Sequence, residues 1–286
     1  MGDVLGKLVE WANARHDVRA VLLTSTRAIP GAWTDILSDY DVILVVTDIL
    51  PWVEKHLWLD DFGKVLVAYW DPIHKDPSLG GEVCGNVVQY SSGLKIDFSL
   101  WPVNLLLQIA HAATLPAELD AGYQVLVDKD QLTQGMLAPT GKAHIPKPPT
   151  RDAYQTLIND FLSDAPYVAK CLVRDELLPA KWCLDYDMKH IYLRQLLEWR
   201  VELDNAWSVP VGSLGKGLKK RLPLEIWSAL ESCYADASME ENWKALERTM
   251  QLFRQVAKAV GESLGYPYPE ELHQNVANYV KHIRQM

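Results

Sequence analysis

A proline-rich segment near the middle of the chain constrains its fold more than any other feature. Residues 138–150 read APTGKAHIPKPPT, with four prolines and one glycine in thirteen residues. Proline fixes φ and removes a backbone donor, so this segment opposes helix and strand and favours an extended linker. The 286 residues suffice for two domains of about 140 residues each. We therefore predict one domain over residues 1–145 and a second over residues 146–286.

The two halves carry different hydrophobic patterns. In the first half, short segments dense in β-branched and aliphatic residues alternate with amphipathic stretches, which predicts strands and helices together. The second half repeats apolar residues with helical spacing almost throughout. We predict strands at residues 19–25, 40–46, 64–69, 86–90 and 95–100, and helices at 4–14, 51–58, 101–113, 153–161, 167–178, 188–204, 224–234, 243–264 and 270–283. The fold class expected is α+β, a mixed sheet with flanking helices followed by a helical bundle.

Composition excludes several function classes. No apolar run approaches the roughly 20 residues that span a bilayer, and the N-terminus lacks the pattern of a secretion signal, so we expect a cytoplasmic protein without a membrane partner. The four cysteines form no CxxC pair, which argues against a zinc site. The net charge is −9, and residues 1–145 hold 18 acidic against 10 basic residues. This balance disfavours nucleic acid and favours metal cations and cationic small molecules, although acidity also serves solubility alone.

Two carboxylates open the second predicted strand. Asp39 and Asp41 are two residues apart, so they point to the same face of a strand. Two carboxylates so close repel each other unless a cation lies between them, and Mg²⁺ prefers such oxygen ligands. A small-residue turn, Thr24-Ser25-Thr26-Arg27, precedes them at the end of the first strand. By itself a pair of acids at a strand edge is usually solvated surface; the order of the motifs makes the prediction.

A third carboxylate occurs on a later strand. In the run KIDFSL, Ile96, Phe98 and Leu100 alternate with polar residues, which leaves Asp97 on the polar face. Asp97 is predicted to complete the metal site with Asp39 and Asp41, to accept the proton of an attacking hydroxyl, or to do both.

This order of motifs resembles the nucleotidyltransferase superfamily. The finer resemblance, over nearly the whole chain, is to the aminoglycoside 6-adenylyltransferase (streptomycin adenylyltransferase) family. The segments that carry it are Ser25-Thr26-Arg27, Ser38-Asp39-Tyr40-Asp41, Trp58, Phe62-Gly63, Lys95-Ile96-Asp97-Phe98, Tyr167-Val168-Ala169-Lys170, Arg174-Asp175-Glu176-Leu177, Ala180-Lys181, Leu196-Leu197-Glu198-Trp199, Gly215-Lys216-Gly217, Trp243 and Tyr266-Pro267-Tyr268-Pro269. The resemblance implies a nucleotidyltransferase-type sheet, Mg²⁺, ATP as co-substrate and transfer of AMP to a hydroxyl of a cationic aminoglycoside. One position departs: the family has glycine where this chain has Thr24, which puts tight nucleotide binding in doubt.

Four further residues are predicted to bind the nucleotide. The Ser25 hydroxyl and the Arg27 guanidinium suit phosphate oxygens, and their alternative is an ordinary polar turn. Lys170 and Arg174 share a helical face, and their alternative is a solvated basic stripe; the resemblance favours Lys170.

A cationic acceptor needs carboxylates and flat apolar surface. The residues predicted to bind it are Glu82, Glu176, Trp182, Asp185 and Asp187, each with an alternative as a cap, core or surface residue. Two other functions stay open. The same chemistry serves a different acceptor hydroxyl, and Thr24 leaves room for a silent nucleotide-binding module. We expect a monomer or a weak homodimer.

Overall fold

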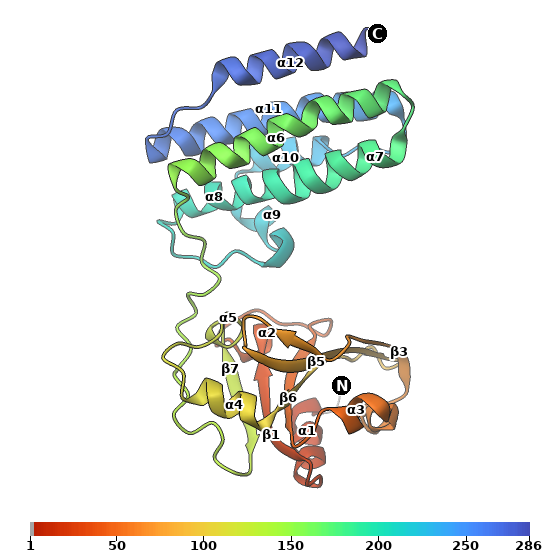
Figure 1. Cartoon of the computed structure of the whole chain (residues 1–286), viewed down its shortest axis with the longest axis vertical. Helices are drawn as coiled ribbons and strands as arrows, with labels where there is room; N and C mark the ends of the chain where they lie inside the picture. Colours follow the sequence, from red (N-terminus) through yellow and green to blue (C-terminus); the bar gives the residue numbers. More distant parts are fainter. Residues whose placement is uncertain (1–2) are drawn as a thin grey trace. The chain divides into compact units, whose positions relative to one another are not determined.

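The computed structural model describes residues 3–286 and divides into two compact units, Met1–His144 and Ile145–Met286 (Figure 1). Residues 138–150 contain neither helix nor strand, as their prolines predict. The elements of the first unit are α1 (Val4–Asn13), β1 (Val18–Thr24), α2 (Ser25–Ala28), β2 (Tyr40–Val46), α3 (Leu50–Glu54), the 3₁₀ helix η1 (His56–Phe62), β3 (Val65–Trp70), β4 (His74–Asp76), β5 (Gly81–Tyr90), β6 (Lys95–Pro102), α4 (Val103–Ala110), α5 (Ala117–Asp120) and β7 (Tyr123–Asp128).

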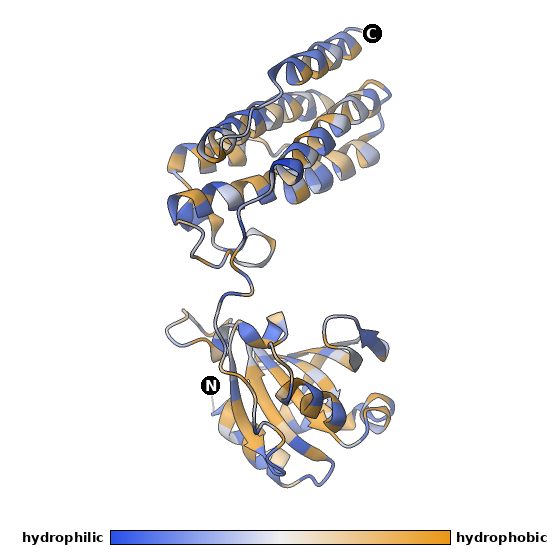
Figure 2. Ribbon diagram, turned by 60° about the vertical axis from the view of Figure 1, so that its left-hand side comes forward, coloured by the Kyte–Doolittle hydropathy of each residue, from blue (hydrophilic) through white to orange (hydrophobic). Residues whose placement is uncertain are grey.

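The first unit is built on a mixed sheet. Its strand order is β3-β5-β6-β2-β1-β7, and β4 pairs with β5. The pair β2–β6 is parallel, and the other neighbours are antiparallel. Figure 2 shows that the central strands are hydrophobic over most of their length, as strands covered on both faces must be. The predicted α+β class with a mixed sheet is confirmed.

Side-chain alternation along the central strands makes two cores, one on each face. Val42, Leu44 and Phe98 pack with helix α1 and residues of α3 and η1 on one face. Ile43, Val45 and Trp101 pack with residues of α4 and α5 on the other. Because Asp41 and Asp97 alternate with Val42 and Phe98, their side chains belong to the second face.

Several elements of this unit differ from the predictions. The helix expected at 51–58 is split into α3 and η1, and the helix expected at 101–113 begins only at Val103 because Trp101 and Pro102 continue β6. Strand β7 was not predicted. Its apolar run, Val125-Leu126-Val127, is only three residues long because Gln124 and Asp128 flank it, so the sequence pattern did not mark it as a strand.

The second unit is helical, as predicted. Its elements are α6 (Arg151–Val173), α7 (Leu177–Lys181), the π-helix η2 (Trp182–Leu193), α8 (Arg194–Asp204), the 3₁₀ helix η3 (Ser213–Gly215), α9 (Leu218–Arg221), α10 (Leu224–Ser232), α11 (Met239–Leu264) and α12 (Glu270–Arg284). In the described residues no helix combines the length and the apolar character that crossing a membrane requires.

The break predicted between residues 161 and 167 is wrong, because α6 runs through Pro166 without ending. Proline in a helix costs about 3 kcal/mol. Here the neighbouring Ala165, Val168 and Ala169 are fully buried, so packing offsets this local penalty. Helix α6 ends instead before Asp175, whose φ of 58° is left-handed.

The helix predicted from residue 188 begins much earlier. α7, η2 and α8 follow one another from Leu177 to Asp204 without an interruption. The polar residues within Asp185–His190 interrupt the apolar spacing by which a helix is predicted, so the start of this helix was missed. Lys189 is nevertheless fully buried, and Asp185 lies 2.6 Å from its ammonium. Short π-helical segments inside α-helices are frequently found at functional sites.

Close contacts between α6 and α11 hold the second core. The rings of Phe161 and Phe253 stack with their centroids 3.6 Å apart. The Tyr154 hydroxyl donates to the carbonyl of Ala257 at 2.8 Å. Gly261 permits this approach, since a Cβ there would lie 2.5 Å from the Tyr154 hydroxyl oxygen.

Candidate active site

Three neighbouring strands bring the predicted site together on one face of the sheet. Asp41 on β2 is paired in register with Thr24 on antiparallel β1 and with Asp97 on parallel β6. Neighbouring strands lie about 4.8 Å apart, and residues in register point to the same side. Asp41 and Asp97, which are distant in sequence, are therefore side by side.

Asp39 joins this pair through a lysine that the sequence analysis did not identify. The ammonium Nζ of Lys95 lies 2.6 Å from Oδ2 of Asp39 and 2.9 Å from Oδ2 of Asp97. Lys95 is two residues before Asp97 on β6, so both point to the same face. The same alternation that placed Asp97 on the polar face of the predicted strand would have found Lys95.

The carboxylates fit a cation. Oδ1 of Asp97 is buried and has no hydrogen-bond partner. Burial and the charge of Asp97 raise the pKa of Asp41, while a hydrogen bond from the Ser25 side chain opposes the rise. An orphaned carboxylate oxygen and a carboxyl group whose ionised form is disfavoured both indicate negative charge that the protein alone leaves undercompensated. Hard oxygen donors of this kind suit Mg²⁺.

The turn before the site accommodates Thr24 without strain. Thr24 is extended, with φ −129° and ψ −172°, and its buried side chain donates from Oγ1 to the carbonyl of Asp41 at 3.4 Å. The left-handed residue is Ser25, with a φ of 58°. Positive φ is uncommon for residues other than glycine and clusters at functional sites. The conformation for which glycine is suited thus falls one residue after Thr24.

Arg27 is occupied by the loop that leads into β2. Its Nε donates to the carbonyl of Asp39 at 2.8 Å, and its Nη2 donates to the carbonyls of Ser38 at 2.7 Å and Asp35 at 3.2 Å. The guanidinium also lies 3.9 Å from the centroid of the Tyr40 ring. These contacts make Arg27 an anchor for the backbone at Asp39.

Lys170 and Arg174 lie in the second unit, at the C-terminal end of α6. Both are exposed, and with Val173, Tyr279, Ile283 and Met286 they line a cavity of about 200 Å³. The Lys170 ammonium is 6.0 Å from the centroid of the Tyr279 ring. The structure thus places both predicted basic residues in one concave surface between α6 and α12. Tyr279 was not predicted, because on the sequence it is one of many helix-face aromatics.

Three of the predicted acceptor residues have other surroundings. Asp185 accepts from two lysines, Lys181 at 2.7 Å and Lys189 at 2.6 Å, so its charge is already compensated. Glu176 is exposed and precedes α7 without capping it through its side chain. Glu82 is exposed on β5, where alternation places it on the opposite face from Val87, the partner of Asp97.

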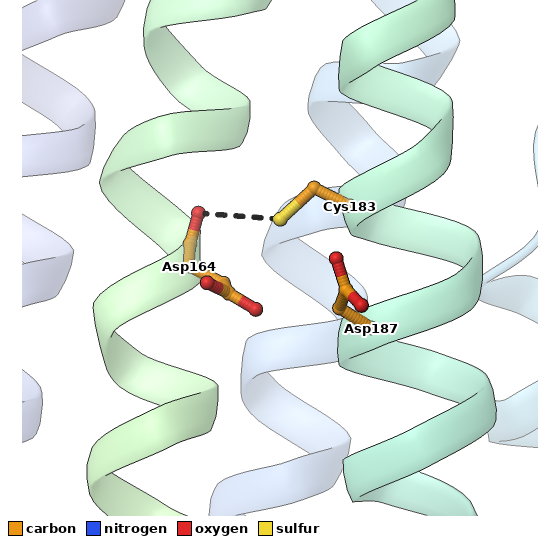
Figure 3. A group of neighbouring side chains, drawn as sticks. All are labelled: Asp164, Cys183 and Asp187. Carbon is orange, nitrogen blue, oxygen red and sulfur yellow. Dashed lines mark hydrogen bonds between the residues drawn. The ribbon is translucent and has the colours of Figure 1, made fainter.

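Trp182 and Asp187 both lie on η2, and Asp187 is close to a carboxylate that was not predicted. Asp164 on α6, Cys183 and Asp187 have oxygen and sulfur atoms that all lie within 4.8 Å of one another (Figure 3). Burial and the charge of Asp187 raise the pKa of Asp164. The exposed rings of Trp182 and Tyr186 follow one another on the same helix, with centroids 5.1 Å apart. Helix η2 therefore carries both a carboxylate that lies close to Asp164 and exposed aromatic rings.

The family model described as streptomycin adenylyltransferase matches residues 2–283. The chain belongs to the streptomycin adenylyltransferase family. It is therefore an adenylyltransferase, and the resemblance noted on the sequence is confirmed.

Relatives named aminoglycoside 6-adenylyltransferase align over nearly the whole chain. An aminoglycoside 6-adenylyltransferase of Bacillus subtilis (strain 168) is 28% identical over 269 residues, which cover 94% of this chain and 92% of that protein. One of Campylobacter jejuni is 27% identical over 288 residues, with coverage of 99% and 94%. A crystal structure of an aminoglycoside 6-adenyltransferase from Bacillus subtilis is similar with 25% identity, a TM-score of 0.45 and 99% of each chain covered.

Proposed function

We propose that this adenylyltransferase transfers AMP from ATP to a hydroxyl of a streptomycin-like aminoglycoside, the 6-hydroxyl of streptomycin, and so confers resistance. The relatives from Bacillus subtilis and Campylobacter jejuni carry the name aminoglycoside 6-adenylyltransferase, and they align over more than nine-tenths of this chain. The observation that carries the proposal is the pairing of Asp41 with Asp97 across β2 and β6, beside Asp39.

In this proposal Asp39, Asp41 and Asp97 hold Mg²⁺. When bound, the metal neutralises charge on the triphosphate and on the departing pyrophosphate. The buried Oδ1 of Asp97, which has no hydrogen-bond partner, supports the assignment. An unpaired buried oxygen carries a desolvation penalty, and a bound cation would relieve it.

Asp97 is also the proposed general base. The acceptor oxygen attacks the α-phosphorus of ATP, and its proton passes to the Asp97 carboxylate. A new oxygen–phosphorus bond forms while the bond from the α-phosphorus to the bridging oxygen breaks, and pyrophosphate leaves. The Ser25 hydroxyl, which bonds to Asp41, is proposed to shift to a phosphate oxygen.

The second unit supplies the remaining proposed contacts. Lys170 and Arg174 are proposed to bind phosphate oxygens, since they are exposed and line one cavity. For the acceptor, we propose Asp187 with Asp164 as partners of a guanidinium or amine, and Trp182 as a flat surface for it. We do not assign Asp185 to this role, because its two lysines already compensate its charge.

Mass spectrometry of streptomycin after incubation with the protein, ATP and Mg²⁺ tests the proposal. The expected product is heavier by one AMP unit, and phosphorus–carbon coupling in its NMR spectrum locates the ester at position 6. Chelation of the metal with EDTA is expected to abolish the product, and added Mg²⁺ to restore it. An unmodified antibiotic under conditions in which the protein is folded would contradict the proposal.

A further inference from the structure

Lys95 places its ammonium between two of the three carboxylates of the site. Its ammonium bridges Oδ2 of Asp39 and Oδ2 of Asp97, at 2.6 and 2.9 Å. These are charge-assisted hydrogen bonds of ordinary length. The bridge joins β6 to the residue just before β2, so Lys95 ties two neighbouring strands together at their polar ends.

The Lys95 ammonium is the cation that pairs with Asp39 and Asp97 in the described residues. Asp39 lies just before β2, Asp41 lies on β2, and Asp97 is paired with Asp41 on the neighbouring strand β6. Among residues 3–286, the ion pairs of Asp39 and Asp97 both go to Lys95. The Arg27 guanidinium bonds to the backbone carbonyl of Asp39 and not to its carboxylate. On β5, the neighbouring side chain Gln89 is neutral and donates to the carbonyl of Leu94.

We propose that Lys95 is an internal counter-ion of the carboxylate site and competes with the divalent metal for Asp39 and Asp97. The inference rests on the proposed metal-dependent function. Without metal, the ammonium reduces repulsion among the three carboxylates and keeps them positioned. A divalent ion bound to the same oxygens has to displace it, because two cations repel each other at this separation. Lys95 is thus a positioning residue that lowers metal affinity and stabilises the metal-free protein.

The test measures metal binding directly, with Mn²⁺ as the probe and without nucleotide. Free Mn²⁺ is counted by electron paramagnetic resonance in titrations of the full chain. In Lys95→Met the Kd for Mn²⁺ is expected to fall about five- to tenfold, which is the size expected for removing two partly exposed ion pairs. The thermal midpoint of this variant is expected to fall without metal and to rise more steeply than that of the wild type as MgCl₂ is added.

Two variants serve as controls for charge and for its position, and a third is held in reserve in case Lys95→Met does not fold. Lys95→Arg keeps the positive charge and is expected to retain an affinity for Mn²⁺ near that of the wild type. Lys7→Met removes the same charge from exposed Lys7 on α1, which packs against the other face of the sheet, and is expected to leave the affinity unchanged. Lys95→Gln replaces Lys95→Met if the latter does not fold, since it removes the charge but keeps a polar side chain.

The outcomes separate this inference from the proposed function. Unchanged or weaker Mn²⁺ binding in Lys95→Met and Lys95→Gln overturns the counter-ion role, even when the wild type adenylates streptomycin. If the wild type binds Mn²⁺ and Asp41→Asn does not, the metal site is supported, independently of the result for the Lys95 variants. Absence of Mn²⁺ binding in both the wild type and the Lys95 variants overturns both.

Discussion

Thr24 on β1 stands opposite Asp41 on β2, and its hydroxyl donates to the Asp41 carbonyl at 3.4 Å. The threonine that replaces the family's glycine is thus an ordinary buried strand residue with extended dihedral angles. Its β-branched side chain suits that conformation. The positive φ that glycine would relieve belongs to Ser25.

Restoring glycine at position 24 is therefore expected to harm the protein. Thr24→Gly loses a buried methyl group and adds backbone freedom within a strand, so unfolding in urea should show a loss of about 1 to 2 kcal/mol. The KM for ATP should not improve. A variant that is equally stable and binds ATP more tightly would show that Thr24 obstructs the nucleotide.

Neutralising any of the three carboxylates is expected to remove catalysis and spare the fold. Asp39→Asn, Asp41→Asn and Asp97→Asn should each lower kcat at least about a hundredfold, the usual cost of losing a charge-stabilising group. Pyrophosphate release measures the rate, and circular dichroism checks the fold. Near-normal turnover in all three variants would refute the site.

Arg27 is expected to act through the loop at Asp39. Arg27→Met loses three hydrogen bonds to carbonyl oxygens, so we expect a lower thermal midpoint, a destabilisation of roughly 1 to 2 kcal/mol and a fall in kcat of about tenfold. Arg27→Lys should rescue little, because an ammonium lacks the planar fork. Hydrogen exchange at residues 35–39 should accelerate in both variants. If Arg27 instead binds the triphosphate, the KM for ATP rises while stability and exchange stay unchanged.

His273 predicts a pH dependence of stability. Burial and the charge of Arg254 lower its pKa in the folded protein from an ordinary value of 6.5, and its Nδ1 lies 2.9 Å from the Tyr268 hydroxyl oxygen. The unfolded chain therefore takes up this proton first as the pH falls. Stability is full above about pH 6.5 and is lost as the pH falls from there toward the lower folded pKa. In His273→Asn the pH slope of the calorimetric midpoint between about pH 5 and 7 should flatten; an unaltered slope would assign it to other groups.

A dense run of β-branched and aliphatic residues was enough to predict the strand that carries Asp41, and alternation was enough for the strand that carries Asp97, because both patterns are local properties of the chain. The pairing of Asp41 with Asp97 is not local, because it depends on β2 and β6 lying next to each other as parallel strands in the folded sheet. The role of Arg27 could not be read from sequence either, since its partners are backbone carbonyls that any residue offers. The course of α6 through Pro166 depends on burial of its neighbours, and the closeness of Asp164 to Asp187 depends on the packing of α6 against η2, which no local pattern shows.

Asp120 on α5 has a practical bearing on any attempt to study the halves separately. Its carboxylate accepts from the backbone amides of Thr140 and Ala143 and from the Thr140 hydroxyl, all at 2.8 to 2.9 Å. Residues 140–143 are thus bonded to the first unit, although they lie well beyond its last strand, β7. A gene truncated after Asp128 would lose these three hydrogen bonds, whereas one ending after His144 would retain them.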